Sequence, residues 1–149
     1  MKTKHAVGIV ALSLAMGMIA VGQGFKVYPG AKKYTPPETD ESKEAEKAMP
    51  PGTQSSIYLT DDAFEKVTAF YGGIGKEYAM PGMNKGGKLP SGQEIKMAFY
   101  IFDGAGDLKA SKSWMKVQRP YIGSVDFKSG TPEYKDIRDV TSIQLVEKK

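Results

Sequence analysis

The chain contains 149 residues, enough for one domain with a single hydrophobic core, and its 40% hydrophobic and 26% charged residues are typical of a globular protein. It has no cysteine and one histidine, His5, so disulfides and thiolate-based metal sites are excluded. The formal net charge of +4 includes only two arginines, Arg119 and Arg138, whereas nucleic-acid surfaces favour arginine for bidentate phosphate contacts.

Residues 1–22 predict a cleavable signal peptide. Two lysines precede an apolar run over residues 6–21, and the small residues Ala20 and Gly22 fit the narrow pockets of signal peptidase, which places cleavage between Gly22 and Gln23. The alternative is a retained membrane anchor, which needs about 20 strongly apolar residues and usually more Leu and Ile than this stretch has. A lipid anchor is excluded because it requires a cysteine just after the signal.

Cleavage would make the working protein periplasmic or secreted and nearly neutral. Loss of Lys2 and Lys4 leaves 19 of the 21 basic residues against 17 acidic ones, a net charge of +2, and the only histidine is lost too. Ser-His-Asp and Cys-His catalysis and imidazole-bound metals are then excluded, so acid–base chemistry would fall to carboxylates, lysine or tyrosine. We therefore predict no metal or cofactor, no nucleic-acid partner and no stable membrane anchor after cleavage.

Residues 23–53 predict an extended N-terminal segment followed by a charged, proline-flanked loop. The residues from Phe25 to Ala31 form a short extended piece that ends in a Pro-Gly turn and enters the fold as an edge element. The stretch 32–53 has almost no apolar face, so we expect a solvated loop or a frayed helix. An interaction tail is the alternative.

Residues 54–149 predict a single domain whose first elements are a strand and a helix. The strand candidate covers 53–60, and Thr60 caps a helix that continues to Tyr71 and ends at a Gly-Gly pair. The apolar stripe of this helix consists of Phe64, Val67, Phe70 and Tyr71.

Further strands are predicted at 76–80, 94–102, 113–119, 121–127 and 139–147. Several strands in series with one good helix and short connections predict an α+β fold, a mostly antiparallel sheet with one main helix packed on one face. The helix stripe is expected to cover the alternating apolar residues of the strand 94–102. These are Ile95, Met97, Phe99 and Ile101.

The turn at 103–107 has the Asp and Gly spacing of a calcium-binding loop. It lacks an oxygen ligand at the third position, which is Ala105, and the twelfth position is Trp114 instead of Glu. We therefore predict a turn without calcium.

Several short motifs follow one another along the chain: Tyr28-Pro29-Gly30-Ala31, Tyr58-Leu59-Thr60-Asp61-Asp62, Phe70-Tyr71 with Gly75-Lys76-Glu77-Tyr78, Phe102-Asp103-Gly104-Ala105, and the segment from Trp114 to Gly123. In this succession the chain resembles a group of small exported bacterial proteins of unknown function. The resemblance implies a location in the bacterial envelope. It brings no established activity, so it assigns no catalytic residues.

The candidate binding surface is the outward side of the strand 113–119. Trp114, Lys116 and Gln118 alternate on that side, with Arg119 and Tyr121 nearby. An aromatic ring beside cations suits an anionic or ring-bearing small ligand, or a partner protein. The alternative is that Trp114 covers a second core face.

These features favour a noncatalytic binding or adaptor domain of the bacterial envelope. One alternative is a histidine-free hydrolase that uses carboxylates such as Asp103, Asp107 and Asp126, although no spacing singles them out. Another is a structural or assembly protein in which the loop 32–53 or a sheet edge pairs with another chain.

Overall fold

The computed structural model describes residues 24–82 and 86–149. The predicted signal peptide and its predicted cleavage site between Gly22 and Gln23 lie outside the described residues. In the described part of the chain, no helix is both long enough and apolar enough to cross a membrane.

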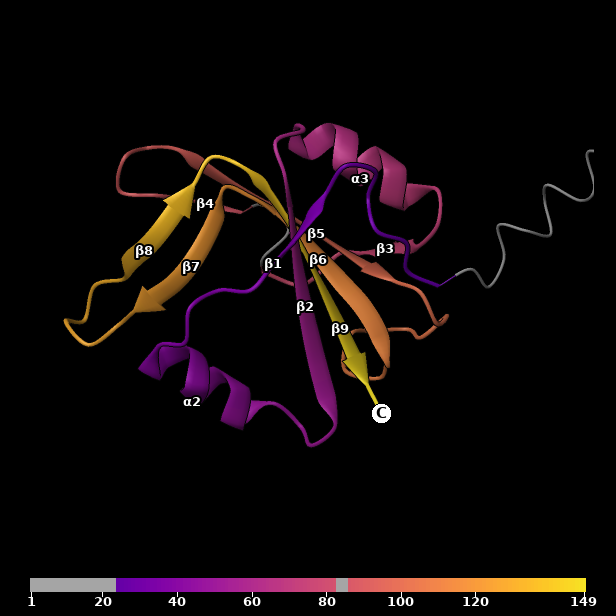
Figure 1. The fold of residues 1–149 in the computed structure, drawn as a ribbon, viewed down its shortest axis with the longest axis horizontal. Coiled ribbons are helices and arrows are strands. Elements are labelled where there is room, and N and C mark those ends of the chain that lie inside the picture. The colour runs from indigo at the N-terminus through magenta and orange to yellow at the C-terminus, as the bar shows by residue number, and fades with distance from the viewer. Residues whose placement is uncertain (1–23, 83–85) are drawn as a thin grey trace, which may run out of the picture.

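The centre of the molecule is one antiparallel sheet of seven strands (Figure 1). Its order is β1-β2-β9-β6-β5-β3, and β4 also pairs with β5. The strands are β1 (Lys32–Tyr34), β2 (Thr53–Thr60), β3 (Lys76–Tyr78), β4 (Gly87–Lys88), β5 (Glu94–Ile101), β6 (Ser113–Arg119) and β9 (Thr141–Lys148). The central strands are long, whereas β1, β3 and β4 at the edges have three residues or fewer, which limits pairing with other chains.

Two further strands, β7 (Tyr121–Asp126) and β8 (Glu133–Arg138), form a separate two-stranded sheet. Only Pro120 separates β6 from β7, and only Asp139 and Val140 separate β8 from β9. β6 and β7 pair with β9 and β8 as the two sides of one long hairpin. Proline has no N–H for a strand ladder, so this hairpin stops pairing as one sheet at Pro120. Its outer half, which we call the β7–β8 arm, extends away from the main sheet (Figure 1).

The fold is β-rich, and the predicted α+β class with one main helix is wrong. Strands make up 41% of the described residues and helices only 15%, in two short helices, α2 (Asp40–Ala48) and α3 (Phe64–Gly72). A nine-residue helix is about 14 Å long, whereas an eight-residue strand is about 27 Å long. Neither helix is long enough to form a layer over the sheet.

The helix α2 lies inside the charged stretch 32–53. Its first turn is held by a capping box in which the Thr39 Oγ1 accepts from the Ser42 N–H at 3.0 Å and the Ser42 Oγ accepts from the Thr39 N–H at 2.9 Å. None of its residues is buried. Local capping therefore forms this helix without an apolar face, which is why hydrophobic periodicity does not show it.

Both faces of the sheet carry apolar clusters. The first lies under α3, where Val67 and Tyr71 of the helix pack on Ala98, Tyr100, Met115, Val117, Ile143 and Leu145. The second lies on the opposite face and contains Phe99, Ile101 and Leu108, with Met97 and Trp114 packed against it. The helix stripe therefore covers Ala98 and Tyr100 of β5, and the expectation that it would cover Ile95, Met97, Phe99 and Ile101 is wrong. Since β5 is apolar on both sides, its alternation did not show which side faces the helix.

Candidate binding pocket

Arg119 anchors the bend at the base of the β7–β8 arm. One guanidinium nitrogen, Nη1, donates to the Asp62 carbonyl and to the Thr141 Oγ1, each at 3.1 Å, and to the Asp61 carbonyl at 3.3 Å. The other, Nη2, donates to the Asp139 carbonyl at 2.9 Å and lies 3.3 Å from the Asp139 carboxylate. The guanidinium is thus already engaged in joining the β2–α3 turn to the start of β9.

Tyr121 also has a position inside the fold. Its side chain is buried, and its ring meets that of Tyr34 edge to face with centroids 5.5 Å apart. The Arg138 guanidinium lies over both rings, 4.7 Å from the Tyr34 centroid and 5.9 Å from the Tyr121 centroid. Burial raises the pKa of Tyr121 to about 12. These contacts attach β1 to the arm.

Trp114 packs into the second apolar cluster. Its ring lies 6.4 Å from that of Phe99, and its side chain is half-buried. The indole Nε1 is buried and has no hydrogen-bond partner among residues 24–82 and 86–149. Trp114 therefore covers the second core face of the sheet, while Lys116 and Gln118 continue along the same side of β6.

Lys116 and Gln118 line a pocket with a volume of about 410 Å³, which we call the Lys116 pocket. Lys116 is the register partner of Phe99 on β5 and of Gln144 on β9, so its side chain rises from the middle of the sheet. It makes no hydrogen bond or ion pair within the described part of the chain, and burial alone lowers its pKa. An apolar setting around an unpaired ammonium group disfavours the charged form.

The walls of the Lys116 pocket are mostly aliphatic and come from separate parts of the chain. β5 contributes Ile95 and Met97, and the β7–β8 arm contributes Ile122, Val125 and Tyr134. Three glycines, Gly82, Gly86 and Gly87, form the rim. The volume lies in the lower part of the range for small-molecule sites, about 300–1,000 Å³.

Gly86 at the rim fits only because it is glycine. Its φ is +61°, a left-handed conformation, and a Cβ atom there would lie 1.7 Å from the Ile95 carbonyl oxygen. This close approach brings the β4 segment against β5 at the pocket. Sequence reasoning missed the rim and the arm as parts of the site, and the one available signal was the Gly86-Gly87 pair.

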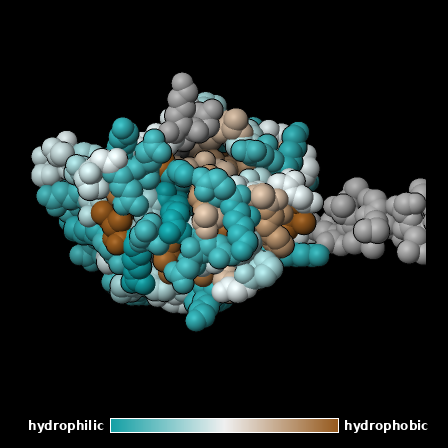
Figure 2. Space-filling model, turned by 90° about the horizontal axis from the view of Figure 1, so that it is seen from above, coloured by the Kyte–Doolittle hydropathy of each residue, from teal (hydrophilic) through white to brown (hydrophobic). Residues whose placement is uncertain are grey.

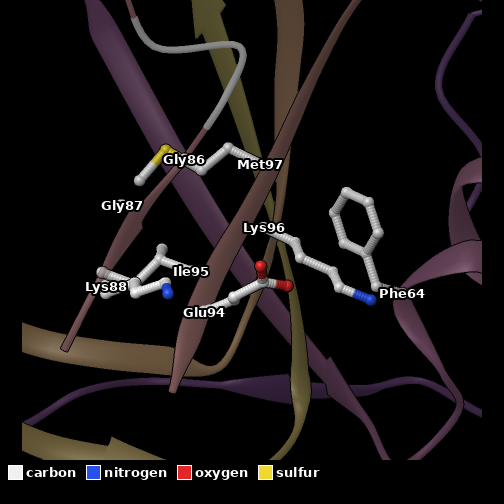
Figure 3. Close-up of a pocket in the computed structure, with 8 residues that line it drawn as sticks. All are labelled: Phe64, Gly86, Gly87, Lys88, Glu94, Ile95, Lys96 and Met97. Atoms are coloured by element: carbon white, nitrogen blue, oxygen red, sulfur yellow. The ribbon is translucent and has the colours of Figure 1, made fainter. Parts of the chain in front are cut away.

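A second hollow of similar volume reaches the N-terminus of α3 and shares Gly86, Gly87, Ile95 and Met97 with the Lys116 pocket (Figure 3). Figure 3 shows Lys96 directed toward Phe64, whereas Met97 lies on the other side of the strand near Gly86. The Lys96 ammonium is already paired with the Glu65 carboxylate, and Glu94 and Lys88 are exposed. Since the charged residues described at this hollow are either paired or exposed, the Lys116 pocket is the stronger candidate.

The carboxylates considered for hydrolysis accept hydrogen bonds from residues of their own loops. The Asp103 carboxylate accepts from the Ser111 Oγ at 2.8 Å, the Asp107 carboxylate accepts from the Ala110 N–H at 2.7 Å, and the Asp126 carboxylate caps the turn that follows it. Figure 1 places the β5–β6 loop and the end of β7 on opposite sides of the molecule. Within the described ranges, no group of three or more acidic or histidine side chains is arranged to hold a metal ion.

The N-terminal motifs meet beside α3 in a structural cluster. The Tyr28 hydroxyl donates to the Asp62 carboxylate at 2.7 Å, and this hydrogen bond, together with Lys66, lowers the pKa of Asp62. The Tyr71 hydroxyl donates to the Lys26 carbonyl at 2.8 Å. Tyr28-Pro-Gly-Ala and Tyr-Leu-Thr-Asp-Asp are thus joined by contacts that fix the chain before β1 to the helix.

Seen from above, the surface is mostly hydrophilic with small, separate hydrophobic areas (Figure 2). Comparisons of the chain with protein-family models, with curated proteins and with solved structures find no match. The resemblance to small exported bacterial proteins stays a prediction, and the functional argument depends on the pocket itself.

Proposed function

We propose that this protein is a noncatalytic binding protein and that the Lys116 pocket holds a small amphipathic anion with an aliphatic body and one negatively charged group. The observation that carries the proposal is an ammonium group without a partner, among the described residues, in a pocket whose other walls are mostly apolar.

The charge of the ligand follows from the cost of leaving Lys116 unpaired. A half-buried ammonium group among apolar side chains loses part of its hydration without gaining a partner, and this burial lowers the pKa of Lys116. A carboxylate or another anion at the Nζ would form a charge-assisted hydrogen bond and restore the charged form. The ligand would then raise the pKa of Lys116 on binding.

The aliphatic body of the ligand is inferred from the apolar walls of the pocket. Ile95, Met97, Ile122 and Val125 offer apolar surface, and burying an aliphatic chain against them stabilises the complex by about 25 cal/mol for each Å² removed from water. No carboxylate is among the described residues that line the pocket. Hydrolysis by a pair of carboxylates, the alternative considered from the sequence, therefore has less support here than binding.

Calorimetric titration with decanoate and decan-1-ol tests the proposal. We expect decanoate to bind about tenfold or more tightly than the alcohol, because only decanoate pairs with Lys116. Lys116→Met should remove that preference while keeping the apolar walls. Lys76→Met is the matched control, since Lys76 is exposed on β3 outside the pocket. Equal binding of decanoate by the wild type and Lys116→Met would contradict the proposal.

We also propose that the protein acts in the bacterial envelope or outside the cell. The support is the charged and apolar pattern of residues 1–22. Mass spectrometry of the protein from a bacterial envelope fraction should find a chain that starts at Gln23. A full-length chain in the cytoplasmic fraction would contradict this location without affecting the pocket.

A further inference from the structure

Gln118 is the second polar side chain of the Lys116 pocket, and its orientation is fixed. Only 5% of the residue is exposed. Its side-chain Nε2 donates to the Pro120 carbonyl at 3.1 Å, and its backbone carbonyl accepts from the Ser142 Oγ at 3.2 Å. A carbonyl oxygen accepts but cannot donate, so the amide nitrogen must face Pro120. The amide oxygen, Oε1, then points away from that contact.

The Gln118 Oε1 makes no hydrogen bond within the described part of the chain, although the residue lines the pocket. This oxygen is not one of the fully enclosed side-chain atoms without a partner, so it stays open to the solvent of the pocket. A ligand donor that replaces water at this oxygen would gain the net value of one hydrogen bond, about 0.5–1.5 kcal/mol. Lys116 and Gln118 are two residues apart on one face of β6, about 7 Å along the strand. A donor group in the ligand would therefore have to lie close to its anionic group.

We infer that the ligand is an aliphatic acid with a hydrogen-bond donor, a hydroxyl or an amide N–H, near its carboxylate. The carboxylate pairs with the Lys116 ammonium, the donor reaches the Gln118 Oε1, and the chain lies against Ile95, Met97, Ile122 and Val125. This inference depends on the proposed function and narrows it to a class of ligand. Gln118 is then the residue that selects acids with a hydrogen-bond donor over unsubstituted aliphatic acids.

The test compares three acids of equal chain length: decanoate, 3-hydroxydecanoate and 3-methoxydecanoate, the last two as separated enantiomers. We expect one enantiomer of the hydroxy acid to bind the wild-type protein about tenfold more tightly than either decanoate or the methoxy acid, since only the hydroxyl can donate. Gln118→Met should bind the three acids with affinities within about threefold of one another, because its side chain accepts only weakly.

Each outcome separates this inference from the proposed function. If decanoate binds but neither enantiomer of the hydroxy acid binds more tightly, the inference is overturned and the proposed function stands. If none of the acids binds, both fail. Should Gln118→Met not fold, the comparison between the hydroxy and methoxy acids on the wild-type protein decides by itself, since the two differ in the hydroxyl donor.

Discussion

Arg119 and Lys116 lie three residues apart on β6, and their surroundings are opposite. On the α3 side of the sheet, Arg119 donates to several backbone oxygens and to a threonine hydroxyl. On the other side, Lys116 has no polar partner among the described residues and faces an apolar pocket. One strand thus contributes a stabilising cation to one face and a candidate binding cation to the other.

The difference shows that the role of a cation depends on the acceptors that other segments bring to it. Those of Arg119 come from Asp61, Asp62, Asp139 and Thr141, which lie 20 to 58 residues away in the sequence. Residue type and spacing placed Trp114, Lys116, Arg119 and Tyr121 on one candidate surface. The structure assigns Arg119 and Tyr121 to the framework and leaves Lys116, with Gln118, at the pocket.

The largest effect is expected from Arg119→Met. The substitution removes the Arg119 donor from the Asp61 and Asp139 carbonyls and from the Thr141 hydroxyl, and the free energy of unfolding should fall by about 3 kcal/mol. The Asp62 carbonyl keeps the Thr141 hydroxyl as a donor. Urea denaturation measures the loss of stability, with Lys76→Met as a control expected to stay within about 0.5 kcal/mol of the wild type. If both variants unfold at the same urea concentration, Arg119 is not the anchor of the bend.

Sequence patterns predicted the long strands better than the architecture. The strand predicted at 113–119 is β6 with the same bounds. The predicted helix ends one residue before α3 does but starts three residues early, because Thr60 is the last residue of β2 and the N-cap is Ala63. The class was wrong because β1, β4 and β8 were not predicted as strands, and β1 and β4 are too short for a periodic signal. For the site, the sequence showed that Lys116 and Gln118 share a face of β6. It could not show that the arm folds beside them, because that depends on contacts between distant segments.

An intermediate effect is expected at the pocket rim. Gly86→Ala places a methyl group 1.7 Å from the Ile95 carbonyl oxygen, so β4 must move away from β5. Gly104→Ala is the matched control, because Gly104 has a similar φ, +73°, with no neighbouring atom within 4 Å of the added carbon. The control should lose about 1 kcal/mol from the backbone conformation alone, and Gly86→Ala about 2 kcal/mol.

The same pair of variants also tests where the pocket lies. Gly86→Ala should weaken decanoate binding because the rim moves, whereas Gly104→Ala should bind it as the wild type does. Equal losses of stability in the two variants would mean that the chain near β4 adapts to a side chain. Unchanged binding by a destabilised Gly86→Ala would show that the rim contributes nothing to affinity.

The smallest effect, and the most direct test of the contrast with Arg119, is expected from Lys116→Met. Removing an unpaired half-buried cation while keeping its apolar stem should raise the free energy of unfolding near neutral pH by about 1 kcal/mol, the opposite sign to Arg119→Met. Among the described residues that line the pocket, Tyr134 is the only other titratable side chain, and it is present in both proteins.

This gain should depend on pH in a defined direction. Burial lowers the pKa of Lys116 in the folded protein below the value of 10.5 expected in the unfolded chain. Between those two values the unfolded chain binds more protons, so the wild type gains stability relative to Lys116→Met as the pH rises. The advantage of the variant should therefore be largest below the folded-state pKa and vanish near pH 10.5, in paired urea denaturations across this range. A difference that stays constant with pH would mean that the Lys116 ammonium is hydrated or paired, and the pocket would then lack the unsatisfied charge that calls for an anion.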